Sequence, residues 1–201
     1  MKTKSEEWLG AAALAILIAQ VVLIILSWLL SAMGQEDVRS LLSSEGIRWF
    51  VGSFSAITAS PLLVWLLLAL SAAGCVRQSG AVTLLVRHRS QSYRDRIAWR
   101  VALFFLGGYI GIVCLLTLVP HAILLSATGQ LFPSAFSRNL LPIIVFGVNT
   151  FCVAFGVMAG RLKSLGDVLL SLSFGIAKGA SLIILYIMLI QFYESLRFVF
   201  G

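Results

Sequence analysis

Lys178 is the residue whose type and position most clearly suggest chemistry, because its charge interrupts a long apolar stretch. It stands 11 positions after Asp167, which is about 16 Å along a helix at a rise of ~1.5 Å per residue. If the hydrocarbon begins near Asp167, Lys178 lies close to the bilayer midplane; if it begins near Phe174, the side chain can snorkel to the interface. Charges inside membranes are costly and often functional. A snorkelling lysine and a protein-facing polar site are both open.

Three amide side chains join Lys178 in this candidate polar membrane site. Gln20, Asn149 and Gln191 each lie within a predicted membrane-spanning stretch. Interhelical hydrogen bonding is the simpler role for such groups, because an amide in hydrocarbon must find a polar partner. Binding of a substrate is the alternative.

The remaining reactive residue types form no catalytic or metal-binding pattern. His88 and His121 have no carboxylate or second histidine at ligand spacing, and the chain carries no hydrolase, P-loop or dinucleotide-binding motif. Three cysteines lie in or at the ends of apolar runs without a CxxC spacing, as small buried hydrophobic residues do: Cys75, Cys114 and Cys152. The sequence therefore predicts no metal, no cofactor and no enzymatic activity.

The composition indicates which elements must position these side chains. The chain has 201 residues, of which 60% are hydrophobic and 11% are charged, against about 25% charged residues in an ordinary soluble domain. The mean hydropathy is +1.01. A soluble globule of this size cannot bury so much apolar surface, which excludes a soluble enzyme, a disordered tail and a disulfide scaffold. Because a membrane helix needs roughly 20 apolar residues, about five spans fill the chain.

We predict an all-α integral membrane protein that forms one membrane domain over 1–201. The expected spans are about 8–33, 60–76, 97–119, 142–159 and 168–193. The first span is longer than the apolar core of a signal peptide, so we expect a retained anchor, and Asp167 is expected to cap the last helix. Residues 34–59 are too polar to span and predict a loop with a short amphipathic segment in the interface. The pattern leaves open whether 50–59 enters the membrane.

The charge distribution predicts the orientation. The net charge of +7 comes from 15 Lys and Arg against 8 Asp and Glu, and it is concentrated in 77–100. Since short cytoplasmic loops are rich in Lys and Arg, this loop is predicted to be cytoplasmic, with the N-terminus inside and the C-terminus outside, and nucleic-acid binding is not needed to explain it. Arginines near an anionic leaflet also attract lipid headgroups. The candidates for that role are Arg87, Arg89, Arg94, Arg96 and Arg100.

Glycines four residues apart occur in each of the last three expected spans. Residues at this spacing share a helix face and allow two backbones to approach closely. The pattern predicts tight packing of these three spans, or dimerisation. The pairs are Gly107 with Gly111, Gly156 with Gly160, and Gly175 with Gly179.

Three sequence stretches resemble one family of transporters. They read SLLSSEGIRW over 40–49, AAGCVRQSG over 72–80 and FGVMAGRLKSLGDV over 155–168, and the last is followed by a helix that contains Gln191 and Phe192. In this order they resemble the AbgT family, the p-aminobenzoyl-glutamate transporters of bacterial inner membranes. The stretch 94–142 resembles the family's membrane helix with a proline-bearing outer loop. The resemblance implies a multi-pass inner-membrane protein that forms a homodimer or a larger membrane complex.

The chain also departs from that family. Members are more than twice as long and contain two membrane hairpins that have no counterpart here, and most of their substrate and proton-coupling residues lie in those parts. No family site residue is therefore carried over. Two functions follow: an AbgT-like transporter of small organic anions such as p-aminobenzoyl-glutamate, or a non-transporting subunit or scaffold of a larger complex. A discontinuous helix at Lys178 would favour transport, and continuous helices packed through their glycines would favour the subunit.

Overall fold

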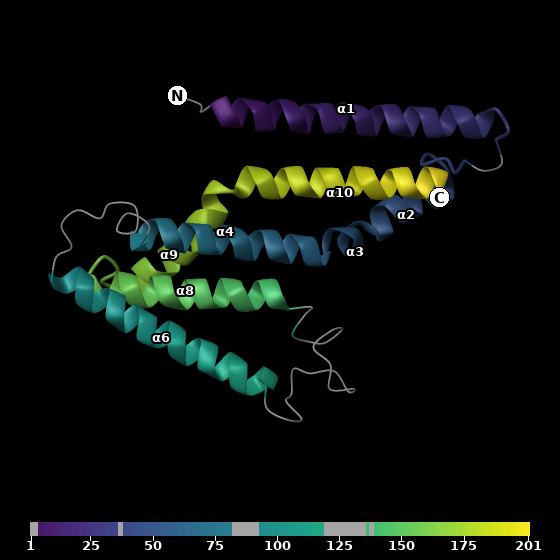
Figure 1. Cartoon of the computed structure of the whole chain (residues 1–201). Coiled ribbons are helices and arrows are strands. Elements are labelled where there is room, and N and C mark those ends of the chain that lie inside the picture. Colours follow the sequence, from purple (N-terminus) through teal and green to yellow (C-terminus); the bar gives the residue numbers. More distant parts are fainter. Residues whose placement is uncertain (1–3, 36–37, 82–92, 119–135, 137–138) are drawn as a thin grey trace. The chain divides into compact units, whose positions relative to one another are not determined.

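The computed structural model describes residues 4–35, 38–81, 93–118, 136 and 139–201, and these contain helices and no strand (Figure 1). The all-α prediction is thus confirmed for the described part of the chain. The helices are α1 (Lys4–Ala32), α2 (Ser44–Gly52), α3 (Phe54–Thr58), α4 (Pro61–Ser79), α6 (Tyr93–Leu118), α8 (Leu140–Met158), α9 (Leu165–Lys178) and α10 (Ala180–Phe200).

Five helices among the described residues are long and apolar enough to cross a membrane. They cover Glu7–Ala32, Pro61–Ser79, Tyr93–Thr117, Leu140–Met158 and Ala180–Phe200. The number agrees with the sequence prediction and makes the chain a multi-pass membrane protein. The side of the membrane on which each terminus lies stays a prediction.

The last expected span differs from the structure at Gly179. Instead of one uninterrupted helix over 168–193, α9 ends at Lys178 and α10 begins at Ala180. Gly179 has φ −90° and ψ 6°, and its carbonyl accepts the first hydrogen bonds of α10, from the amides of Leu182 at 2.9 Å and Ile183 at 3.2 Å. Glycine has the conformational freedom for such an interruption and a poor helix propensity. Gly179 is therefore the N-cap of α10.

The chain forms two compact units, which are described separately. Unit 1 comprises 1–64 and 179–201, and unit 2 comprises 65–178. In unit 1, α1 and α10 pack side by side. Gln20 meets Ser195, and Leu23, further along α1, packs in one cluster with Val199, further along α10. The two helices are therefore parallel, and parallel spans require an odd number of crossings between them, which α4, α6 and α8 supply.

The SLLSSEGIRW stretch builds a compact turn in unit 1. The hydroxyl of Ser43 caps α2 by accepting the amide of Gly46 at 3.0 Å. A Cβ on Gly46 would come within 2.7 Å of the Leu41 backbone, so only glycine fits there. Trp49 stacks on Phe198 of α10 with ring centroids 4.4 Å apart. Each of these contacts stabilises the fold of unit 1 and depends on one particular residue of the stretch.

Residues 34–59 thus contain two short helices, α2 and α3, as the expected amphipathic segment suggested. The exposed side chains of Glu45 and Arg48 lie on α2. The hydroxyls of Ser60 and Tyr186 are hydrogen-bonded and attach the start of α4 to α10. The depth of 50–59 in the membrane stays open.

Unit 2 contains the rest of α4 together with α6, α8 and α9. The α6 and α8 helices pack around a small core of Ala98, Ala102 and Phe155, and the hydroxyl of Tyr109 donates to the Ile143 carbonyl at 2.8 Å. The two helices are antiparallel. Trp99 near the start of α6 therefore packs edge-on against Phe151 near the end of α8, with ring centroids 5.2 Å apart.

Two arginines at one end of unit 2 donate hydrogen bonds to carbonyls at helix C-termini. Arg161 Nη1 donates to the Ser79 carbonyl of α4 at 2.7 Å, and Arg94 Nε donates to the Met158 carbonyl of α8 at 3.3 Å. Cations at this position offset the unsatisfied carbonyls and the negative end of the helix dipole. Arg94, which the sequence predicts to attract lipid headgroups, is therefore hydrogen-bonded to the C-terminus of α8.

Candidate polar site in the membrane

The structure brings two of the predicted polar residues together between α1 and α10. The amide nitrogen Nε2 of Gln20 donates to Ser195 Oγ at 3.0 Å. The Ser195 hydroxyl in turn donates to the Gln191 backbone carbonyl at 2.8 Å. Ser195 is fully buried, and Gln191 is 6% exposed. Gln20 and Ser195 are thus linked to Gln191 through its backbone carbonyl, and these three residues form a polar cluster in which Ser195 is the member that the sequence did not single out.

This cluster lies at the middle of both spans. Gln20 stands 13 residues after Glu7 and 12 before Ala32, the ends of the first candidate span. Gln191 stands 11 residues after Ala180 and nine before Phe200, the ends of the last one. Both amides therefore lie near the middle of the two candidate spans.

The amides of the cluster are only partly hydrogen-bonded. Gln20 Oε1 and both Oε1 and Nε2 of Gln191 are buried without a partner among the described residues. Leaving such an atom unsatisfied costs roughly 1–3 kcal/mol, and proteins rarely retain groups of this kind without a role. The three atoms provide one donor group and two acceptors at one place in the membrane.

A groove lies beside the cluster and is lined by both glutamines, although the unpartnered amide atoms are themselves buried. Its volume is about 310 Å³, at the lower end of the range of roughly 300–1,000 Å³ typical of ligand sites. Apart from the two glutamines its described lining is apolar and includes an aromatic ring: Ile16, Leu17, Gln20, Val21, Phe54, Ile187, Met188 and Gln191. A small molecule in this groove would meet mostly apolar side chains, and it would reach the amide atoms only if the glutamine side chains turn towards it.

Lys178 lies in unit 2 and is exposed. Its ammonium lies over the ring of Phe174, 4.8 Å from the centroid. This cation–π contact stabilises the charge by about 0.5–2 kcal/mol and directs the side chain back along α9. The spacing of four residues places Phe174 and Lys178 on one face of α9, and this spacing is the sequence signal for the contact.

The position of α9 relative to α4 fixes the depth of this lysine within unit 2. A Cβ on Gly175 would meet the backbone of Leu70, and one on Gly74 would lie 2.8 Å from the Cα of Gly175. Leu70 is the midpoint of Pro61–Ser79, nine residues from either end. The helix α9 thus reaches the middle of the α4 span only three residues before it ends at Lys178.

Asn149 lies in α8 of unit 2, and its Oδ1 is buried without a partner among the described residues. It lines a second, apolar groove with α6 and α9 side chains. Thr150 also lines this groove, and Asn149 is not one of the residues that form the cluster in unit 1.

The predicted glycine pairs have separate roles rather than one. Gly175 makes a backbone contact, but its partner is Gly74 of α4, which the fourfold spacing did not single out. Gly160 has φ +73° and ends α8, where the amide of Arg161 bonds to the Gly156 carbonyl at 2.9 Å in the manner of a Schellman motif. A Cβ on Gly107 or Gly111 would meet nothing among the described residues within 4 Å.

Asp167 acts at the start of α9 in unit 2, although not as its N-cap. The helix begins at Leu165, and Asp167 Oδ2 accepts the backbone amides of Lys163 and Ser164, both at 2.9 Å. The amide of Asp167 bonds in return to Ser164 Oγ at 3.1 Å, which makes a capping box. The hydrogen bonds from the Lys163 and Ser164 amides lower the pKa of Asp167.

Of the predicted headgroup-binding arginines, Arg87 and Arg89 lie outside the described residues, as does His88. Arg96 and Arg100 are exposed on α6. The three cysteines are free thiols, and Cys75 and Cys152 are buried. No group of three or more His, Cys, Asp or Glu that could hold a metal occurs in the described parts of the chain.

The fold and the cluster define the class of protein: a multi-pass, all-helical membrane protein with a polar site between two of its spans. Comparison with known proteins does not narrow this class, since no protein-family model, no curated protein and no solved structure matches the chain significantly.

Proposed function

We propose that this chain is an AbgT-like transporter of small organic anions, such as p-aminobenzoyl-glutamate, in a bacterial inner membrane. The observation that carries the proposal is the partly hydrogen-bonded glutamine pair, Gln20 and Gln191, at the middle of two spans. Polar groups at this depth face a substrate path more often than lipid. The resemblance of 40–49, 72–80 and 155–168 to the AbgT family supplies the substrate class.

The chemistry of p-aminobenzoyl-glutamate matches the groove. Its carboxylates and its amide carbonyl accept hydrogen bonds, which Gln191 Nε2, unpartnered among the described residues, can donate once its side chain turns into the groove. Its amino and amide N–H groups donate, and the Oε1 atoms of Gln20 and Gln191 accept. The aromatic ring fits the apolar wall that includes Phe54 and Met188.

The interruption between α9 and α10 supports transport as well. Discontinuous helices near the midplane are a recurring feature of secondary transporters, in which one part of the protein moves against another around the site. The α9 helix has 14 residues and is about 21 Å long, too short for a core of roughly 30 Å. Along the α4 span, α9 reaches the level of Leu70 and ends three residues later.

A non-transporting subunit is the second candidate, and two observations favour it. No charged side chain among the described residues lines the groove beside Gln20 and Gln191. Lys178, the cation of the predicted polar site, already lies over Phe174. Such a subunit would co-purify with larger membrane proteins in mild detergent, whereas a transporter that works alone, or as the homodimer that the family resemblance implies, would purify as this chain only.

Flux measurement tests the proposal. Proteoliposomes that contain the wild-type chain should accumulate or release radiolabelled p-aminobenzoyl-glutamate faster than empty vesicles. Gln191→Met should abolish this flux, because methionine keeps the size of the side chain and removes its donor and acceptor. Asn149→Leu is the matched control, an amide removed from unit 2, and should retain flux. Wild-type flux no greater than that of empty vesicles would reject the transporter.

A further inference from the structure

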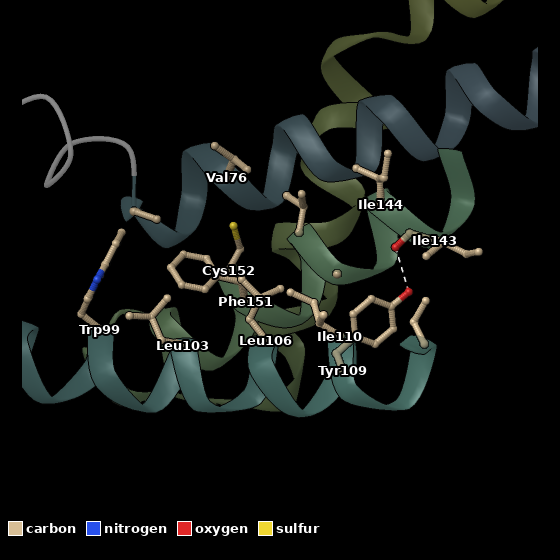
Figure 2. Close-up of a pocket in the computed structure, with 14 residues that line it drawn as sticks. Val76, Trp99, Leu103, Leu106, Tyr109, Ile110, Ile143, Ile144, Phe151 and Cys152 are labelled. Carbon is tan, nitrogen blue, oxygen red and sulfur yellow. Dashed lines mark hydrogen bonds between the residues drawn. The ribbon is translucent and has the colours of Figure 1, made fainter. Parts of the chain in front are cut away.

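An apolar groove of unit 2 lies between α6 and α8 (Figure 2). It has a volume of about 580 Å³. Its walls are Trp99, Leu103, Leu106, Tyr109, Ile110 and Val113 from α6 and Ile143, Ile144, Gly147, Val148, Phe151 and Cys152 from α8, and Val76 and Ala81 also line it. The Tyr109 hydroxyl is already bonded to the Ile143 carbonyl. The lining therefore offers hydrocarbon and almost no hydrogen bonding.

The ends of the groove indicate what fills it. From Trp99 to Val113 it follows fourteen residues of α6, about 21 Å, which is longer than one leaflet of a hydrocarbon core of roughly 30 Å. Trp99 is fixed at one end by edge-on contacts with Phe151 and Phe155, and tryptophan is typical of the headgroup level. The groove is therefore long enough to hold the acyl chain of a lipid in one leaflet.

Two cations stand at the Trp99 end. Arg96 is seven residues before Leu103, which places it near the edge of the α6 face that carries this groove wall, and Arg100 lies one turn after Arg96 on the flank of that face. Both are exposed, and neither forms a hydrogen bond or ion pair with a described residue. In contrast, Arg94 and Arg161 at the same end of unit 2 are bound to helix carbonyls. Arg96 and Arg100 remain available to an anion.

We propose that this groove binds one anionic phospholipid, with an acyl chain along α6 and α8 and its phosphate at Arg96 and Arg100. The bound acyl chain packs against the exposed side chains of Leu103 and Ile110 in place of bulk lipid. The two guanidinium groups donate to the phosphate oxygens, an arrangement in which Arg is favoured because of its planar donor geometry. The site lies in unit 2 and is separate from the glutamine cluster.

Thermal unfolding of the delipidated full chain in detergent tests this. Added phosphatidylglycerol should raise the unfolding temperature at concentrations about tenfold lower than phosphatidylcholine does, and inorganic phosphate alone should have no effect. Native mass spectrometry should show one retained phosphatidylglycerol. Equal effects of both lipids, or an equal effect of free phosphate, would overturn the proposal.

Variants separate the two halves of the site. Arg96→Gln with Arg100→Gln should remove the preference for phosphatidylglycerol, while Arg48→Gln, an exposed arginine on α2, should preserve it. Leu103→Trp and Ile110→Trp fill the groove from its rim and should prevent retention of the lipid, whereas Ile112→Trp, on an exposed position outside the groove, should not. Retention by the rim variants, or a doubled particle mass that a second copy of the chain accounts for, would contradict lipid binding there.

Discussion

Helix contacts in the two units are made in opposite ways. In unit 2, α4 and α9 meet backbone to backbone at Gly74 and Gly175, where no side chain intervenes. In unit 1, α1 and α10 meet through Gln20, Ser195 and Gln191, and several amide atoms lack partners among the described residues. The first contact has one close-packed arrangement. The second contains polar groups without partners, which is why we propose it as the ligand site and the first contact as the scaffold.

The scaffold contact should show the largest effect on substitution. Gly175→Leu places a side chain against the Leu70 and Gly74 backbones, which cannot yield, so we expect a loss of about 3 kcal/mol or more in unfolding free energy. Gly111→Leu is the matched control and should cost little, because nothing described lies near its Cβ position. Thermal unfolding in detergent measures both. Equal stability of the two variants would remove the distinction between the two contacts.

The polar contact should respond in the opposite direction. Gln191→Met removes two buried atoms without a hydrogen-bond partner, so the unfolding free energy should rise by roughly 1–2 kcal/mol while flux is lost. Gln20→Met differs, because it also breaks the bond to Ser195, worth about 1 kcal/mol, and should change stability less. Destabilisation by Gln191→Met would show that its amide supports the fold instead of a ligand.

Lys178 should have a smaller effect than either contact. Lys178→Met removes the cation–π contact with Phe174, about 1 kcal/mol, and also the cost of a charge in the membrane, so the stabilities should nearly cancel. We expect flux to stay close to wild type, since the lysine lies over Phe174 of its own helix and is not one of the residues of the glutamine cluster. Abolished flux in Lys178→Met with retained flux in Lys178→Arg would place the substrate anion at Lys178.

The smallest effect is expected at the α9 capping box and depends on pH. The pKa of Asp167 is lower in the folded chain than its ordinary value because backbone amides bond to its carboxylate. The cap therefore stabilises the fold above the unfolded pKa of about 4, and this contribution is lost as the pH falls through the folded value. The unfolding temperature of Asp167→Asn should change less with pH over that range. Identical pH profiles would contradict the cap.

Much of the fold could be predicted from the sequence because apolar length alone sets the number of spans. The expected span 142–159 corresponds to α8, and 60–76 to most of α4. The interruption at Gly179 could not be predicted, since apolarity continues through it and glycine spacing there indicated helix packing. The capping role of Gly160 could not be predicted for the same reason. A glycine that ends a span and a glycine at a helix crossing can have the same spacing in the sequence.

The candidate site was predictable by residue type and not by arrangement. An amide inside an apolar stretch is visible in the sequence, which is how Gln20 and Gln191 were found. Their pairing depends on α1 and α10 being parallel neighbours 171 positions apart, which no local pattern contains. Ser195 escaped notice because serine is common in membrane helices, where its hydroxyl usually bonds to its own backbone.

Direct binding of the substrate tests the central claim, that the glutamine cluster is a ligand site. Detergent-solubilised wild-type chain should bind radiolabelled p-aminobenzoyl-glutamate saturably, and Gln191→Met should bind about tenfold more weakly, as the loss of one to two hydrogen bonds to a ligand implies. Asn149→Leu should bind like the wild type. Wild-type affinity in the Gln191→Met variant, or the absence of saturable binding to the wild-type chain, would contradict the claim.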